Sequence, residues 1–257
     1  MAKPRENGSI VYSFATSYER GAKTLYVNVI PKYECPNSCR FCSRADAIMG
    51  RPNIYEKKTG TNLYLKEAPQ VEEITREINA RIKKPVLGLF GGTKEIAFVG
   101  LGEPLMQFGL VCDTIHAIRS SGYRGRIRVD TNGLIECIWP GVMFGCFEHV
   151  ETNPARELKE AGLTDIWISV NATNVYEYEK LCRPRFKNSF EKLCEFVKDC
   201  KREGIKTFAS FVVGFNDDEV KTRSPQEYIE FAKSLGIKRK NVVIRGYIPP
   251  IANWQNS

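Results

Sequence analysis

Three cysteines in one short segment carry the clearest chemical signal in this sequence. Cys35, Cys39 and Cys42 are spaced C-x3-C-x2-C and directly follow the β-rich segment 24–30. Three thiolates can bind three irons of a cubane cluster and leave the fourth iron without a protein ligand. A complete set of four cysteines suits electron transfer, whereas an open iron can bind and reduce another molecule. The spacing therefore predicts an open 4Fe-4S cluster at these cysteines.

Two simpler interpretations of the same cysteines remain open. Zinc normally takes four ligands at fixed spacings, such as paired C-x2-C units. This sequence has no second C-x2-C unit, and its only histidines, His116 and His149, lie far downstream. The other alternative is three ordinary buried thiols without a metal. The spacing favours the cluster over both.

Six further cysteines show no comparable pattern. They are Cys112, Cys137, Cys146, Cys182, Cys194 and Cys200. Their spacings include no short clustered ligand set, so a second cluster is not expected. Cys194 shares a helical face with Phe190 and Val197, where a free cysteine behaves as a small buried hydrophobe.

Length and composition indicate one domain with an apolar core. The chain has 257 residues, 42 % of them hydrophobic, which suits an α/β barrel folded as a single unit. We expect this domain to span 1–257, with an N-terminal extension at 1–23 and a tail at 248–257. No apolar run reaches the length of a membrane span, and residues 1–8 lack the apolar stretch of a signal peptide. These features predict a cytoplasmic protein without membrane association, a compartment that fits reduced cysteines.

The charge balance points to an anionic partner. The formal net charge is +8, which suits a nucleic acid and equally a phosphorylated or carboxylated small molecule. The basic residues are scattered along the chain, however, and scattered charges of this kind are commonly solvated surface.

Hydrophobic patterns along the chain alternate between strands and helices. Strands are expected at 24–30, 95–100, 126–131, 165–171, 206–213 and 241–246, with helices at 71–82, 110–118, 190–197 and 224–236. Such alternation implies a parallel sheet with right-handed crossovers. Six βα units are too few for a closed eight-unit barrel. We therefore predict an α/β fold, a partial, open-sided (β/α)6 TIM-like barrel with outer helices.

Two segments lie outside this repeat. Residues 9–18 are expected to add a strand, and residues 53–66 to form a hairpin around Thr59-Gly60-Thr61. The hairpin, the loop 134–151 and the tail 248–257 are the segments expected to contact a substrate.

Polar residues and glycines follow the strands at their carboxyl ends, where ligands bind in parallel α/β sheets. These segments are Gly100-Leu101-Gly102-Glu103-Pro104, Asp130-Thr131-Asn132-Gly133, Ser169-Val170-Asn171, Val213-Gly214-Phe215-Asn216-Asp217 and Arg245-Gly246-Tyr247. Taken alone, each is consistent with a simple turn. Their repetition at five successive strand ends indicates a large polar ligand that lies across the open barrel.

The whole set of motifs resembles the core of the radical S-adenosylmethionine (SAM) superfamily over residues 25–247. In that family the open iron is chelated by SAM, and one electron cleaves SAM to methionine and a 5′-deoxyadenosyl radical, which abstracts hydrogen from a substrate. The resemblance implies that Cys35, Cys39 and Cys42 are the cluster ligands at the catalytic centre. It also implies that Gly100, Gly102, Glu103 and Pro104, a Gly-x-Gly-Glu-Pro variant with Leu101 inserted, hold the methionyl amine.

Further SAM contacts follow from the same resemblance. Thr131, Asn132, Ser169 and Asn171 are expected to face the ribose or the carboxylate, and Phe41, Val213 and Gly214 to lie beside the adenine. Arg183 either forks onto a carboxylate of SAM or substrate, or stacks on Pro184 at the surface. In this scheme the cofactor carries the difficult chemistry, while the protein supplies orientation and excludes water.

Within the superfamily, the chain resembles most closely the small radical SAM proteins associated with TatD-type nucleases. The segments that carry this resemblance are Leu25-Tyr26-Val27-Asn28, Cys35-Pro36-Asn37-Ser38-Cys39, Gly102-Glu103-Pro104, Thr131-Asn132-Gly133, Ser169-Val170-Asn171-Ala172 and Leu181-Cys182-Arg183-Pro184. The nuclease association favours a nucleic acid or nucleotide as substrate.

The leading functional prediction is a radical SAM enzyme that acts on an unidentified substrate and receives electrons from a flavodoxin- or ferredoxin-type donor. A glycyl-radical-enzyme activase and a small-molecule or peptide-modifying enzyme are alternatives within this class. Outside it, a non-catalytic iron–sulfur redox carrier or sensor and a zinc-stabilised binding module remain open.

Overall fold

The chain forms one open sheet whose strands lie in sequence order. The computed structural model describes residues 6–13, 24–51, 53–82, 93–138, 153–215 and 219–248. Within these residues the sheet has the order β1-β2-β3-β4-β5-β6-β7. Its strands are β1 (Val11–Tyr12), β2 (Thr24–Val27), β3 (Glu95–Phe98), β4 (Arg126–Thr131), β5 (Asp165–Ser169), β6 (Lys206–Val213) and β7 (Val242–Gly246). β2 to β7 are parallel, and β1 pairs antiparallel with β2.

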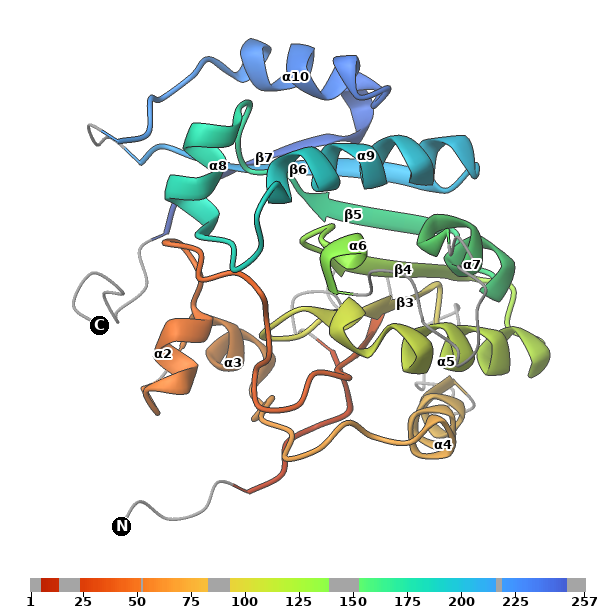
Figure 1. The fold of residues 1–257 in the computed structure, drawn as a ribbon. Helices are drawn as coiled ribbons and strands as arrows, with labels where there is room; N and C mark the ends of the chain where they lie inside the picture. The colour runs from red at the N-terminus through yellow and green to blue at the C-terminus, as the bar shows by residue number, and fades with distance from the viewer. Residues whose placement is uncertain are drawn as a thin grey trace, which may run out of the picture.

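Helices cover one face of this sheet (Figure 1). The helices of the described residues are α2 (Arg44–Ile48), α3 (Ile54–Thr59), α4 (Val71–Ile82), α5 (Phe108–Ser120), α6 (Ile135–Ile138), α7 (Pro154–Ala161), α8 (Val175–Cys182), α9 (Ser189–Arg202) and α10 (Pro225–Ser234), with short 3-10 turns η1 (Pro104–Gln107) and η2 (Arg239–Asn241). Helices α4, α5, α7 and α9 contact one another in succession along this face, whereas α2 and α3 lie apart from them. No helix among the described residues combines the length and apolar character needed to cross a bilayer.

The predicted open α/β barrel is confirmed. Each expected strand is present, and the N-terminal segment contributes β1, although residues 14–23 lie outside the described residues. The sheet does not close, because β1 and β7 are its two edges. Among the described residues, no strand pairs with the outer edge of β7.

The predicted hairpin at 53–66 is wrong, because its first half is the helix α3. Asn53 caps this helix, with its Oδ1 accepting a hydrogen bond from the Glu56 backbone N–H at 2.8 Å. Gly60 ends the helix in the left-handed conformation, at φ 66°. A capping asparagine and a C-terminal glycine are helix signals, and here they outweigh the turn propensity of Thr59-Gly60-Thr61. The helix α7 was also not predicted, although Asn153 and Pro154 mark its start.

Apolar side chains from the sheet and the outer helices form the main core. Phe98 on β3, Ile115 on α5, Phe196 on α9 and Phe211 on β6 are completely buried in it. Such burial is the dominant favourable contribution to folding. The core therefore holds the outer helices against the strands whose ends carry the predicted site.

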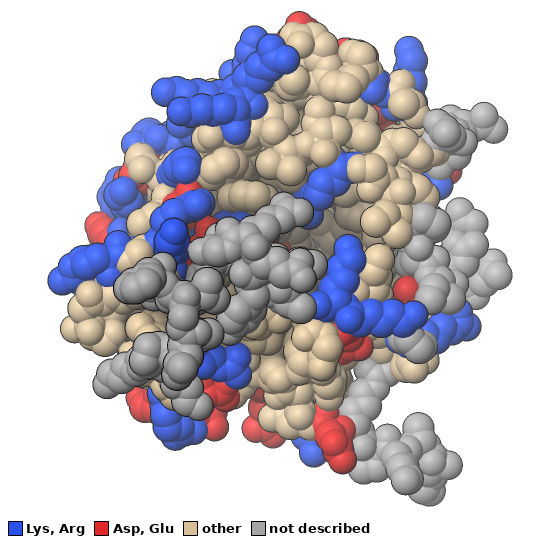
Figure 2. Space-filling view, turned by 180° about the vertical axis from the view of Figure 1, so that it is seen from behind, with Lys and Arg blue, Asp and Glu red and all other residues tan. Residues whose placement is uncertain are grey.

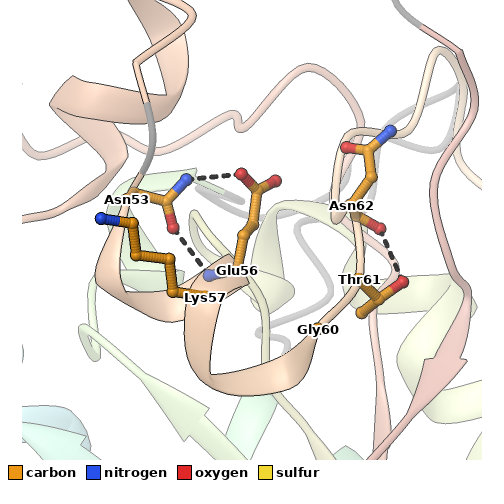
Figure 3. A pocket seen from close by; sticks show the side chains of 6 residues that line it. All are labelled: Asn53, Glu56, Lys57, Gly60, Thr61 and Asn62. Carbon is orange, nitrogen blue, oxygen red and sulfur yellow. Dashed lines mark hydrogen bonds between the residues drawn. The ribbon is translucent and has the colours of Figure 1, made fainter.

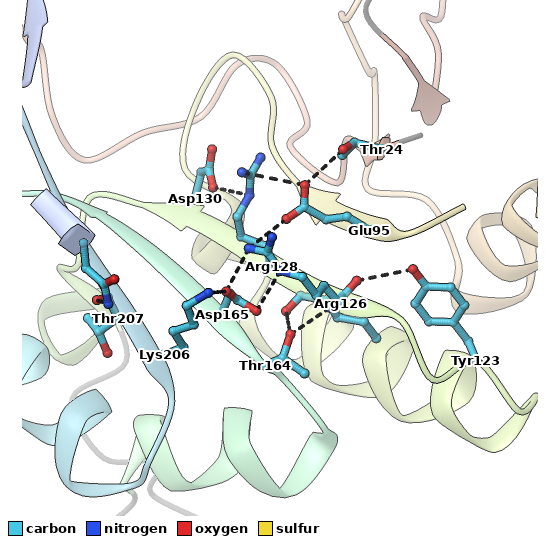
Figure 4. A network of polar contacts seen from close by, with 12 residues as sticks. Thr24, Glu95, Tyr123, Arg126, Arg128, Asp130, Thr164, Asp165, Lys206 and Thr207 are labelled. Carbon is cyan, nitrogen blue, oxygen red and sulfur yellow. Dashed lines mark hydrogen bonds and ion pairs between the residues drawn. The ribbon is translucent and has the colours of Figure 1, made fainter. Parts of the chain in front are cut away.

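Charged side chains link the amino-terminal halves of β3 to β6 (Figure 4). Arg126 pairs with Asp165 at 2.8 Å and with Glu95 at 3.3 Å, and Lys206 lies 3.5 Å from Asp165. Arg128 pairs with Asp130 at 3.0 Å and lies over the Trp167 ring, 4.5 Å from its centroid. Ligands in such barrels bind at the carboxyl ends of the strands, so the part of this network around Arg126, Asp165 and Lys206 is expected to stabilise the fold. Asp130, by contrast, lies at the ligand-binding end.

Replacement of Asp165 by asparagine tests that network. Burial alone would raise the pKa of Asp165, but hydrogen bonds from Arg126 and Thr164 and the charge of Lys206 lower it. A lowered carboxyl pKa stabilises the folded state above the unfolded pKa of about 3.9, and this stabilisation disappears as the pH falls through the folded pKa. We expect Asp165→Asn to lower the free energy of unfolding by about 1–3 kcal/mol at pH 7, since its basic partners are half exposed.

Urea unfolding at pH 7 and pH 3 measures this effect. The difference from wild type should shrink at pH 3. Asp113→Asn, an exposed aspartate on α5, is the matched control and should be neutral. Equal stability of both variants at pH 7 would contradict the assignment.

Candidate active site

The cysteine segment is a loop between β2 and α2. The Cys42 backbone N–H donates to the Cys39 carbonyl at 3.1 Å, which closes a tight turn, and α2 begins two residues after Cys42. Arg44, at the start of α2, is only 7 % exposed and donates to the backbone carbonyls of Tyr33 and Asn37. One buried guanidinium therefore fixes the loop on both sides of Cys35.

The end of helix α8 supports the same loop. The Ser38 N–H donates to the Cys182 carbonyl at 3.1 Å, and the Arg40 N–H donates to the Leu181 carbonyl at 2.9 Å. The Asn37 side chain donates to the Tyr178 hydroxyl at 3.3 Å. The Leu181-Cys182-Arg183-Pro184 motif thus contacts the cysteine loop through its backbone.

One cavity of about 710 Å³ collects most of the predicted site residues. A volume of this size suits a small-molecule ligand. Its lining includes the predicted residues Cys35, Cys39, Phe41, Cys42, Gly100, Gly102, Glu103, Thr131, Asn132, Ser169 and Asn171. Residues from the ends of β3, β4 and β5 therefore face the cysteine loop across a single space.

Four predicted contacts do not line this cavity. Pro104 is buried at the start of η1. Arg183 ends α8 in the left-handed conformation, at φ 45°, and its carbonyl accepts from Ser38 N–H. The Val213 carbonyl accepts from the Tyr247 N–H, and Gly214 follows with φ 93°. Direct contact of these four with a ligand in the cavity has no support from their positions.

Other cavity residues were not predicted as ligand contacts. Lys57 on α3 was not identified, because the hairpin interpretation concealed its helix. Asp130 and Arg245 were noted only as strand-end residues, although both line the cavity. Side chains alternate between the two faces of a strand, and this alternation is the sequence signal that could have identified Asp130 and Arg245 as inward-facing.

The two glycines after β3 allow the chain to pass very close to the cysteine loop. A Cβ on Gly102 would lie 2.4 Å from the Glu34 carbonyl oxygen, and φ is 147° there. A Cβ on Gly100 would lie 2.6 Å from Asn28 Oδ1. The Glu103 N–H also donates to the Glu34 carbonyl at 2.9 Å. Because residues 100 and 102 lack side chains, the segment after β3 can lie directly against the segment that leads into the cysteine loop.

Gly102→Ala should destabilise the protein by about 3 kcal/mol, because the methyl group meets backbone atoms at an unfavourable φ. The measurement is urea unfolding. Gly109→Ala is the matched control, since nothing lies within 4 Å of a Cβ there and alanine favours its helix. A Gly102→Ala variant as stable as Gly109→Ala would show that the close approach is absent.

Glu103 connects the ends of β3 and β4. Its Oε1 accepts from Leu105 N–H at 2.9 Å and from the Thr131 hydroxyl at 2.7 Å, and its Oε2 accepts from Asn132 N–H at 2.6 Å. Burial raises its pKa to about 7, against the opposing effect of these three hydrogen bonds. Its carboxylate is thus engaged with the protein, so its contribution to the site is positional.

Two asparagines hold strand ends near the cysteines. Asn132 Oδ1 accepts from Leu134 N–H at 2.9 Å, and its Nδ2 lies 3.8 Å from the Cys35 sulfur. Asn171, with φ 62°, accepts from Val212 N–H at 3.3 Å and donates to the Cys182 sulfur at 3.6 Å. Both amides therefore combine a backbone turn with a contact to a thiol.

The thiol chemistry fits a cluster. Burial raises the pKa of the Cys35 and Cys42 thiols, and contact with Cys182, followed by burial, raises that of Cys39. Iron must displace these protons, because the thiolate is the ligand form. Among the described residues, no group of three or more His, Cys, Asp or Glu side chains is arranged to hold one metal ion. A cubane makes a different demand, because each thiolate binds a different iron and the sulfurs surround a volume.

The parallel α/β barrel thus places three cysteines beside one cavity lined by residues from the strand ends. The family model described as "Radical SAM superfamily" matches residues 29–224. The chain therefore belongs to the radical SAM superfamily. It is an enzyme of that superfamily, whose members use a 4Fe-4S cluster and SAM.

Curated relatives and solved structures agree with this placement. A GTP 3′,8-cyclase from Alkaliphilus oremlandii (strain OhILAs) is 28 % identical over 72 % of this chain and 47 % of its own length. A GTP 3′,8-cyclase from Peptoclostridium acidaminophilum is 32 % identical over 50 % of this chain and 34 % of its own. The chain thus spans less than half the length of these relatives.

The fold is similar to that of Streptococcus suis SuiB bound to S-adenosylmethionine. The TM-score is 0.54 and the identity 13 %, and the match covers 93 % of this chain and 43 % of SuiB. The resemblance to the TatD-associated group, the single-domain organisation and the cytoplasmic location stay predictions.

Proposed function

We propose that this chain binds a 4Fe-4S cluster through Cys35, Cys39 and Cys42, cleaves SAM reductively, and abstracts hydrogen from a substrate in the same cavity. The cluster and SAM supply the electron transfer and the radical. The observation that carries the proposal is that the three cysteines and the strand-end motifs line one cavity. A flavodoxin- or ferredoxin-type donor would supply the electron.

The chain's own residues position the cofactor in this proposal. The backbone at Gly100 and Gly102 would receive the methionyl amine, because no side chain blocks approach there. Glu103 would keep that segment in register with the Thr131-Asn132 turn through the hydrogen bonds described above. Ser169, one of the hydroxyl side chains in the cavity lining, would face the ribose or the carboxylate.

An aromatic cluster supports an adenine position near Phe41. The Phe41 and Phe215 ring centroids lie 5.9 Å apart, and Phe215 and Tyr247 lie 4.4 Å apart. Phe41, the member of this cluster that lines the cavity, would stack with a planar base and exclude water, with Phe215 and Tyr247 packed behind it. Val213 and Gly214 directly precede Phe215 and support it through the backbone.

A nucleotide is the proposed substrate class. The two curated relatives are both named GTP 3′,8-cyclase, and the net charge of +8 favours an anionic ligand. No specific observation favours a glycyl-radical-enzyme activase.

Anaerobic SAM cleavage tests the proposal. The protein is reconstituted with iron and sulfide, then given SAM and dithionite, and 5′-deoxyadenosine is measured by chromatography. A brown protein that forms 5′-deoxyadenosine is expected. A brown protein that forms none, with or without GTP, would indicate a redox or sensing role, and a colourless zinc protein would overturn the cluster assignment.

A further inference from the structure

The acidic groups in the barrel interior are matched by basic partners. Glu95 and Asp165 pair with Arg126 and, respectively, with Arg128 and Lys206. Asp130, which lines the cavity, is 3.0 Å from Arg128. The three carboxylates of this network thus face three basic side chains (Figure 4). The network consequently leaves little negative charge to neutralise another cation.

Arg245 adds a fourth basic side chain to these three carboxylates, and its charge acts to lower the pKa of Asp130. Arg245 is on β7, the edge strand of the open sheet, and it lines the cavity. Its one hydrogen bond to a described side chain runs from Nη2 to the Ser210 hydroxyl at 3.3 Å. Among the described residues, no carboxylate lies within ion-pair distance of its guanidinium. Its remaining donors are therefore available at this edge of the sheet.

Lys57, on helix α3, adds a second basic side chain to the lining of the same cavity. Figure 3 shows its side chain pointing away from the Glu56 carboxylate. Glu56 is engaged elsewhere, since it accepts from Asn53 Nδ2, the Tyr33 hydroxyl and Leu63 N–H at 2.6 to 3.0 Å. Within the described part of the chain, Lys57 has no ion pair.

The other carboxylates at the cavity do not cancel these two charges. Glu103 is enclosed by its three hydrogen bonds, and Asp46 is buried on α2, at 2 % exposure. On the face of the molecule seen in Figure 2, Lys and Arg side chains border a hollow in the surface. Lys57 and Arg245 are thus the two basic side chains of the cavity lining that make no ion pair with a described residue.

We propose that Arg245, assisted by Lys57, binds a phosphate group of the substrate at the open edge of the sheet. This inference rests on the proposed function, because it assigns the substrate of that site. The two positive charges of Arg245 and Lys57 match the charge of about −1.5 to −2 on a phosphate monoester. A substrate with a single carboxylate would neutralise only one of these two charges. The planar guanidinium donates two parallel hydrogen bonds to phosphate oxygens, and the lysine adds a point charge. Ser210 holds the guanidinium toward the cavity.

Calorimetric titration of the full, reconstituted chain tests the assignment. The ligands are pyrophosphate, GTP, guanosine and SAM. Wild type should bind GTP more tightly than guanosine. Arg245→Gln should weaken pyrophosphate and GTP about tenfold or more, as expected for charge-assisted hydrogen bonds, and should leave guanosine unchanged. Lys57→Gln should weaken pyrophosphate less, since it loses a point charge only.

Arg202→Gln is the matched control. Arg202 is an exposed arginine of the outer helix α9 beside Asp199, and its loss should change no affinity. Wild-type pyrophosphate affinity in Arg245→Gln, equal wild-type affinities for GTP and guanosine, or no binding of pyrophosphate and GTP would each overturn the proposal. Loss of SAM affinity alone would assign Arg245 to the SAM carboxylate and also overturn it. The 5′-deoxyadenosine assay without GTP separately tests the proposed function.

Discussion

Replacement of Cys39 and Cys182 together by alanine should reduce 5′-deoxyadenosine formation to the level of a blank without protein. Cys39 is a proposed cluster ligand, and loss of a ligand leaves an iron of the cubane unbound. The second substitution matters because the Cys182 thiol lies against Cys39. In the single variant Cys39→Ala, that buried thiol remains next to the vacated position. We therefore expect the single variant to retain more iron than the double variant.

Iron and sulfide content and the visible absorption band measure cluster loading independently of SAM cleavage. Cys194→Ala is the control, because Cys194 lies on the outer helix α9 and should load and cleave SAM like wild type. Circular dichroism shows whether the barrel is folded in each variant. Wild-type iron content in the folded double variant would overturn the ligand assignment.

Replacement of Glu103 by alanine should lower the free energy of unfolding by about 3–5 kcal/mol. The change removes a buried side chain and leaves the Leu105 N–H, the Thr131 hydroxyl and the Asn132 N–H without their acceptor. Because these donors belong to the ends of β3 and β4, affinity for SAM should fall as well. The measurement is urea unfolding at pH 6, below the raised pKa of about 7, because ionisation of the buried carboxyl at higher pH destabilises wild type and narrows the difference.

Two variants make that result specific. Glu103→Gln keeps one carbonyl oxygen for Leu105 and Thr131, and it should cost less than the alanine variant. Glu160→Ala removes an exposed glutamate of α7 and should be neutral. If Glu103→Ala proved as stable as Glu160→Ala, the carboxylate would not connect the strand ends.

Local sequence patterns accounted for the strands and for the four longest described helices, α4, α5, α9 and α10. Each parallel strand is a short apolar segment between polar turns, and that pattern depends on neighbours in the chain. The error at α3 has the same origin. Asn53 and Gly60 signal a helix, whereas Thr59-Gly60-Thr61 signals a turn, and a six-residue helix is too short for its periodicity to decide between them.

The site was predictable where chemistry depends on spacing and unpredictable where it depends on packing. The cysteine spacing and the strand-end motifs indicated the cluster, the cofactor and the cavity edge. Arg183 shows the limit. Its motif lies against the cysteine loop, but the contact is made by its backbone carbonyl, and Arg183 does not line the cavity.

The sequence alone determined the alternation of strands and helices, the family and the three candidate ligands, because these follow from residue type and local spacing. Only the tertiary structure decided that Asn37 meets Tyr178, 141 residues away, that Cys182 lies against Cys39, and that Arg245 forms no ion pair with a described residue. Such contacts depend on how the crossovers bring distant strand ends together. These long-range contacts determine how deeply a side chain is buried and which ionic partners it has, so local sequence patterns do not predict them.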